Sequence, residues 1–198
     1  MSSKYRIPEI YGKLENELYD KNREFNVLIG LISEKPNLEV IDKLVSNNHV
    51  GEFKGTLNGI RRLNGNIIDS LSSCNDELKS LKNYLNEGDI SADKSELDSI
   101  MNELNGFEEK LEFLIRDLPN KSKELNNLIE NVEQLLERHK SGEQNSEVKN
   151  SLVSNMMSLV EIADKFKSQK EDVMNTMNMI LKINNKLFSY IDEKRKAV

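Results

Sequence analysis

Hydrophobic residues between positions 53 and 85 recur at alternating steps of four and three residues. This spacing places every member on one face of an α-helix and, sustained over more than four heptads, is typical of helices that pack along a shared apolar seam. A β-strand would alternate every second residue instead, and such alternation is nearly absent from the chain. The pattern predicts one long helix whose seam comprises Phe53, Leu57, Ile60, Asn64, Ile67, Leu71, Cys74, Leu78, Leu81 and Leu85.

Two later stretches of the chain repeat this spacing. The pattern that ends at Leu118 resumes in phase beyond Pro119, which favours a kinked but continuous helix; a new helix capped by Ser122 is the alternative. The last stretch has further apolar residues beside its seam, and so wide a stripe needs more than one partner helix. The predicted seams comprise Leu97, Ile100, Leu104, Phe107, Leu111, Leu114, Leu118, Leu125, Leu128, Val132 and Leu135, and then Leu152, Met156, Leu159, Ala163, Phe166, Lys170, Val173, Met177, Ile180, Asn184, Leu187 and Ile191.

Prolines and polar clusters mark where the helices begin and end. Pro8 suits the first turn of an N-terminal helix, because proline lacks the N–H that is unpaired there in any case. Asp93 is a suitable N-cap after a loop at residues 86–93, and the polar stretch 140–146 predicts a second loop. Residues 46–51, which read SNNHVG, form either a turn or a kink.

These signals together predict an all-α fold. We expect residues 1–198 to form a single elongated antiparallel helical bundle with coiled-coil segments. The bundle should contain three long helices and, in addition, a shorter N-terminal helix. The predicted helices span residues 8–33, 38–48, 50–86, 93–139 and 146–194.

Four glycines between residues 51 and 65 lie on the helix face opposite the seam, and each costs about 0.5 to 1 kcal/mol relative to alanine in a helix interior. A phosphate-binding loop is excluded because neither GxGxxG nor GxxxxGK occurs, and interleaved charges exclude a membrane-helix contact. We expect Gly51, Gly55 and Gly59 to let another helix approach closely, either within the chain or from a partner. A hinge is the alternative.

Three polar residues interrupt the predicted seams, namely Asn64, Lys170 and Asn184. A buried polar group in such a position is satisfied only by another polar group, so it fixes register or partner choice at some cost in stability. We expect these residues to have that role. The alternative is that they lie near solvent at the edge of the bundle.

Composition excludes several classes of partner. The formal net charge is −6, whereas duplex nucleic acid is bound by a clustered excess of positive charge, so we expect no nucleic-acid partner. No run of about 18 apolar residues occurs, and the N-terminal stretch lacks the apolar segment of a secretion signal. We therefore expect a cytoplasmic or nuclear protein and no membrane partner.

Motifs for catalysis and metal binding are also missing from the sequence. A lone Cys74 and two histidines, His49 and His139, provide neither a disulfide nor a set of zinc ligands. Neither histidine follows a glutamate by three residues, as the di-iron sites of helical bundles require, and no catalytic triad is recognisable. We expect no enzyme, no cofactor and no metal site.

The sequence carries no family signature, because heptads of leucine and isoleucine occur in many unrelated proteins. We expect a non-enzymatic scaffold, adaptor or tethering subunit that binds protein partners through its helices, with a homodimer as one such assembly. One alternative is a secreted or injected helical effector that binds a host protein. Another is a helical bundle at a membrane surface, which would need a basic face that an acidic chain is poorly suited to supply.

Overall fold

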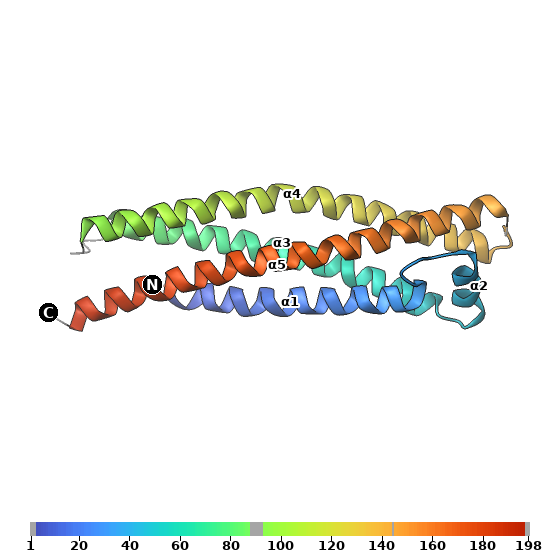
Figure 1. Ribbon diagram of the computed structural model, residues 1–198, viewed down its shortest axis with the longest axis horizontal. Coiled ribbons are helices and arrows are strands. Elements are labelled where there is room, and N and C mark those ends of the chain that lie inside the picture. The colour runs from blue at the N-terminus through green and yellow to red at the C-terminus, as the bar shows by residue number, and fades with distance from the viewer. Residues whose placement is uncertain (1–2, 88–92, 144, 197–198) are drawn as a thin grey trace. The chain divides into compact units, whose positions relative to one another are not determined.

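The computed structural model describes residues 3–87, 93–143 and 145–196. All regular structure in these residues is α-helical, which confirms the predicted fold class. The helices are α1 (Ser3–Ile32), α2 (Leu38–Ser46), α3 (Val50–Glu87), α4 (Lys94–Lys140) and α5 (Ser146–Lys196) (Figure 1).

The observed helix bounds lie within two residues of the predicted ones except at the start of α1. This helix begins at Ser3, so Pro8 lies inside it and not in its first turn. The proline removes only the hydrogen bond that its nitrogen would have donated to the carbonyl of Lys4, and the helix tolerates this loss near its end. α4 likewise continues through Pro119, so the alternative of a new helix beginning at Ser122 is wrong.

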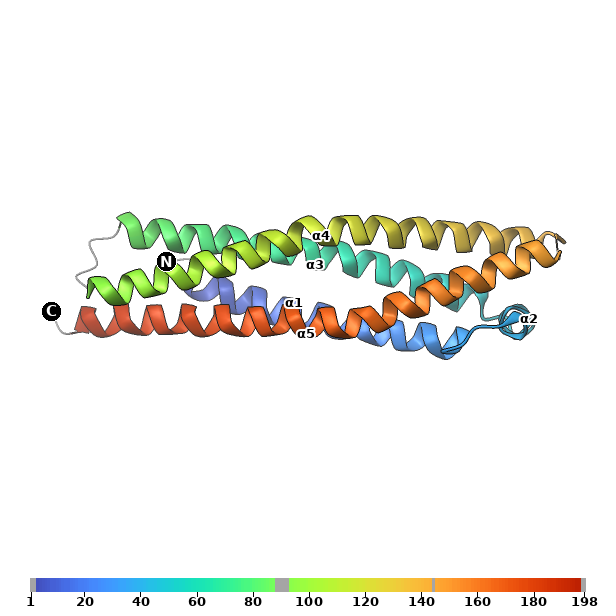
Figure 2. The ribbon, with the colours of Figure 1, turned by 45° about the horizontal axis from the view of Figure 1, so that its top comes forward.

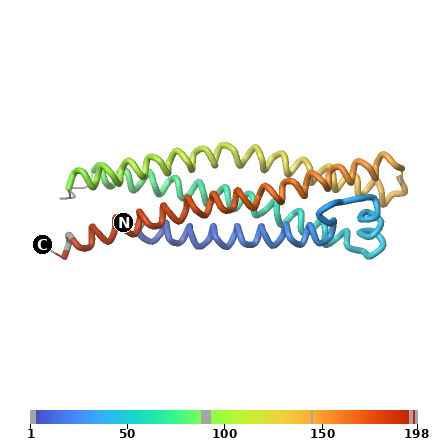
Figure 3. The backbone as a smooth tube through the Cα atoms, viewed as in Figure 1, coloured from blue at the N-terminus to red at the C-terminus, as the bar shows by residue number. Residues whose placement is uncertain are grey.

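The connection between α2 and α3 is a turn. α2 begins after Asn37, whose Oδ1 accepts a hydrogen bond of 3.0 Å from the backbone N–H of Glu39. It ends at Ser46, and Asn48 then adopts a left-handed conformation with φ of 57°. Asparagine tolerates this conformation better than most residues, so the chain can reverse here without glycine. Figure 3 traces this path from α1 through α2 into α3.

The other predicted helix boundaries are formed by capping residues. Oδ1 of Asp93 accepts a hydrogen bond of 3.1 Å from the N–H of Ser95, which confirms the predicted N-cap of α4. Between α4 and α5 the chain turns at Gly142, whose φ of +101° favours glycine. Asn145 then caps α5 by accepting a bond of 2.8 Å from the N–H of Val148. The predicted loop at 86–93 falls largely on residues 88–92, outside the described part of the chain.

The chain divides into two compact units, and each of the four long helices contributes one segment to each unit. Unit 1 comprises Met1–Asn16, Ile67–Leu118 and Glu171–Val198. Unit 2 comprises Glu17–Asn66, which includes α2, and Pro119–Lys170. The expectation of a single domain over the whole chain stays a prediction.

Polar contacts define the helix directions inside unit 1. The ammonium of Lys4 pairs with Asp192 at 2.6 Å, and the Tyr11 hydroxyl donates a hydrogen bond of 2.7 Å to Asn178. Because residue numbers rise along α1 as they fall along α5, these two helices are antiparallel, and the two views in Figures 1 and 2 show the same arrangement. A further ion pair joins Lys82 of α3 to α4.

Unit 2 contains the same kind of antiparallel pairing between α3 and α4. Lys54 pairs with Glu137, and Arg61 with Glu130 at 2.9 Å, so residue numbers again run in opposite directions on the two helices. α2 is joined to the start of α5 by an ion pair of 3.4 Å between Asp42 and Lys149.

The core follows the predicted seams on α3 and α5. All ten predicted positions of α3 are buried, and so is every predicted position of α5 except Lys170, which is half-buried. Each Å² of apolar surface that these side chains remove from water stabilises the fold by about 25 cal/mol, and this burial is the main favourable contribution to folding. The four-three spacing is therefore confirmed as the pattern of burial on both helices.

The buried line of α4 matches the predicted seam at seven of its eleven positions; Leu97 and Leu114 before Pro119 are only half-buried, and so are two positions beyond it. We expected Leu128 and Leu135 in the seam, but both are half-buried, and Ile129 and Leu136 are buried in their place. A straight α-helix has 3.6 residues per turn, so a strict seven-residue repeat drifts around it and a step of one residue restores contact. The helix is continuous as predicted, and Leu125 and Val132 keep the phase of Leu118, whereas the other line of the seam is shifted by one residue.

Candidate functional site

The glycines of α3 face open space. A Cβ atom added at Gly51, Gly55 or Gly65 would meet no atom within 4 Å, and one added at Gly59 would meet the side chain of Glu24 at 3.5 Å. That distance is an ordinary van der Waals contact. Within the described chain no helix packs tightly against Gly51 or Gly55, so the internal form of the close-packing hypothesis is wrong there. Packing against a partner and the hinge alternative both stay predictions.

The polar seam residues lie inside the units to different degrees. Asn64 in unit 2 is 6% exposed, and Asn184 in unit 1 is 1% exposed, whereas Lys170 is half-buried. The burial of both asparagines contradicts the alternative that they lie near solvent. Their role in register or partner choice stays a prediction.

Asn184 is the most unusual of these residues. Within the described chain neither its Oδ1 nor its Nδ2 has a hydrogen-bond partner, and Oδ1 of Asn75, also in unit 1, lacks one too. A buried polar atom without a partner costs roughly 1 to 3 kcal/mol, because it loses its bonds to water and gains none. The core of unit 1 thus contains a polar side chain that its own neighbours do not satisfy.

A buried lysine in unit 2 was not predicted from the sequence. Lys21 of α1 is 8% exposed, and its Nζ lies 4.4 Å from the centre of the Phe166 ring and 5.8 Å from that of Phe25. The two rings are 5.3 Å apart and tilted by 40°. Burial lowers the pKa of Lys21 to about 8. Its burial could have been predicted from the sequence, because the heptad spacing of apolar residues from Leu18 to Phe25 includes position 21.

α2 presents an apolar face that is only partly covered. At 100° per residue, its five apolar side chains fall within an arc of about 160°. Ile41 and Leu44 in the middle of this arc are buried, whereas Leu38 is 47% and Val45 37% exposed at one edge. We call the exposed pair Leu38 and Val45 the α2 edge. Single exposed apolar residues are common, but two adjacent ones on a short amphipathic helix form a small apolar surface.

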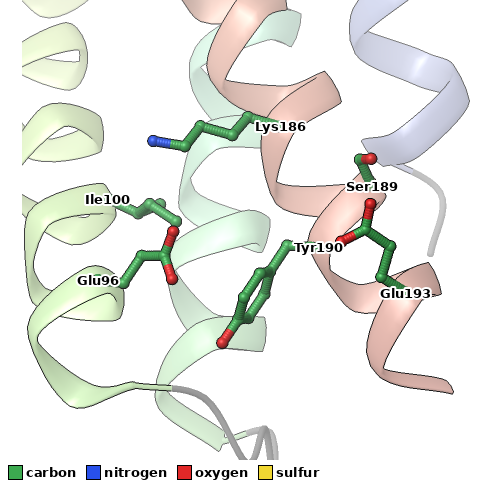
Figure 4. Close-up of a pocket in the computed structure, with 6 residues that line it drawn as sticks. All are labelled: Glu96, Ile100, Lys186, Ser189, Tyr190 and Glu193. Carbon is green, nitrogen blue, oxygen red and sulfur yellow. The ribbon is translucent and has the colours of Figure 1, made fainter. Parts of the chain in front are cut away.

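Unit 1 has a shallow pocket of about 220 Å³ between the start of α4 and the end of α5. Figure 4 shows Glu96 and Ile100 projecting from α4 toward Tyr190 of α5, while Lys186 extends from α5 toward α4. The remaining lining residues are Ser189 and Glu193. Charges of both signs line the pocket beside the apolar side chain of Ile100, an arrangement that selects no single class of ligand.

The described residues contain no group of three or more His, Cys, Asp or Glu side chains placed to hold a metal ion. None of the helices in the described residues is long and apolar enough to cross a membrane. No protein-family model, curated protein or solved structure matches the chain.

Proposed function

We propose that this protein is a non-enzymatic scaffold, adaptor or tethering subunit of the cytoplasm or nucleus, and that the α2 edge is a contact point for a protein partner. The supporting observation is the uneven coverage of the apolar arc of α2. A helix that only anchored itself to unit 2 would need the buried pair Ile41 and Leu44, and the parts of Leu38 and Val45 that stay exposed add nothing to that role.

The setting of α2 suits such a contact. The helix is held in place by the Asn37 cap, by burial of Ile41 and Leu44, and by the ion pair between Asp42 and Lys149. The α2 edge is therefore presented on an ordered element, which reduces the entropy lost on binding. A partner helix could place its own apolar stripe against Leu38 and Val45, with polar contacts around them.

Site-specific photo-crosslinking in the cells that produce the protein tests this proposal. A photoreactive amino acid is placed in turn at Leu38, at Val45 and, as the matched control, at Lys43, which is exposed on the opposite face of α2. We expect one common adduct from positions 38 and 45 that is absent from position 43. No adduct, or the same adduct from all three positions, would contradict the proposal.

The mass of the adduct identifies the kind of partner. A product of about twice 22.8 kDa would make the partner a second copy of the chain, and light scattering on a sizing column should then give a mass that rises with concentration. Any other mass would indicate a different protein, and the purified chain should then keep a mass near 22.8 kDa throughout.

A further inference from the structure

We infer that the C-terminal part of α5, residues 171–196, is the opening element of unit 1: it separates from its neighbours before the remainder of the unit unfolds. This inference concerns the stability of unit 1 and does not depend on the proposed function. Three observations within unit 1 support it.

The first observation is the unsatisfied amide of Asn184. This side chain lies among Ile180, Ile183 and Leu187, which are all buried, yet both of its polar atoms lack partners in the described chain. Both atoms would regain hydrogen bonds from water if this segment moved outward. The amide therefore lowers the free-energy difference between the closed state and an open one, whereas an apolar side chain at this position would raise it.

The second observation is the pocket between α4 and α5. Its lining residues Lys186 and Tyr190 lie on the face of α5 opposite Asn184, so contact between α4 and α5 is interrupted along the same segment. Side chains beside such a gap lose the van der Waals contacts that a packed neighbour would supply.

The third observation concerns the polar contacts that hold this segment to α1. The side chains of Lys4 and Asp192 are 32% and 42% exposed, and the hydrogen bond from Tyr11 to Asn178 is only partly buried. Contacts of this kind are weakened by competition with water and by salt.

Hydrogen exchange of the full-length protein, followed by mass spectrometry, tests the inference. We expect amides of residues 171–191 to exchange faster than those of 67–85, which belong to α3 in the same unit. Asn184→Leu should slow exchange in 171–191 by on the order of tenfold, since it removes two unpaired groups. Asn185→Leu is the matched control, because Asn185 is exposed and the change in helix propensity is the same.

Asn184→Ala provides a second test if leucine is too large for the site, because alanine removes both polar atoms without adding volume. It should also slow exchange in 171–191, by a smaller factor. The inference would be overturned by equal exchange in 171–191 and 67–85. It would also be overturned if both Asn184 variants left exchange unchanged or accelerated it, which is the result expected if an internal water already satisfies the amide. Equal slowing of exchange by Asn185→Leu would overturn it as well.

Discussion

Replacement of Lys21 by methionine should stabilise the protein at neutral pH. Methionine keeps the unbranched, flexible shape of lysine and fills the same space between Phe25 and Phe166, but it carries no charge. Burial lowers the pKa of Lys21 from 10.5 to about 8. Since one pKa unit corresponds to 1.36 kcal/mol, the charged form is disfavoured in the folded state by roughly 3 kcal/mol.

The aromatic rings offset part of this penalty. A cation 4.4 Å from the centre of one ring and 5.8 Å from that of another gains about 0.5 to 2 kcal/mol. We therefore expect Lys21→Met to raise the free energy of unfolding at pH 7 by about 1 to 3 kcal/mol. Chemical denaturation followed by circular dichroism measures this difference. Lys165→Met, which removes an exposed lysine next to Phe166, is the control and should change stability by less than about 0.5 kcal/mol.

The gain from Lys21→Met should also depend on pH in a defined direction. Between about pH 8 and 10.5 the unfolded chain holds a proton on Lys21 that the folded chain has lost, so stability of the unmutated protein rises with pH in this window through this group. The advantage of the variant is therefore full below pH 8 and disappears as pH approaches 10.5. A variant that is less stable at pH 7, or whose advantage is the same at pH 7.5 and 10, would refute this reasoning.

Three further predictions concern glycine, cysteine and tyrosine positions. Gly55→Ala should raise the free energy of unfolding by about 0.5 to 1 kcal/mol because its Cβ enters open space, whereas Gly142→Ala should lower it because φ is +101°; denaturant titration of both variants checks the contrast. Cys74 should react with alkylating reagents at pH 8 only when the chain opens, because burial and the nearby charge of Glu77 raise the pKa of its thiol to about 12; labelling that is equally fast with and without denaturant would contradict this. Tyr11→Phe should cost about 1 kcal/mol through loss of the hydrogen bond to Asn178, and a double mutant with Asn178→Ala should show the two effects to be non-additive.

The parts of the fold that were predictable are those governed by local periodicity. The seam of α3 was correct at every position, because an amphipathic helix of any length must bury the same face and a four-three spacing defines that face. Asp93 and Gly142 were recognisable for similarly local reasons, since a cap depends on the residue itself and its nearest backbone groups. The start of α1 was wrong because Pro8 is also tolerated in the second turn.

Features that depend on neighbouring helices were not predictable. The step in the buried line of α4 depends on where helical drift is corrected, which the packing of other helices decides. The sequence predicted a helix from residue 38 but not which part of its apolar arc α5 and its neighbours would cover. Lys21 is an intermediate case: its position in the spacing of α1 was visible, but its aromatic neighbour Phe166 lies 145 positions away along the chain.

Unit 1 is built from segments that lie far apart in the sequence, and this has a consequence for the newly made chain. Lys4 contacts Asp192, 188 residues away, whereas Lys82 and Glu108 in the same unit are only 26 residues apart. A ribosome releases these segments in order, so the contact between α3 and α4 can form while the last segment of α5 has yet to be synthesised. The start of α1, which carries the buried residues Ile7, Ile10 and Leu14, is therefore made first, but its contacts with α5 can form only after the last segment has been synthesised.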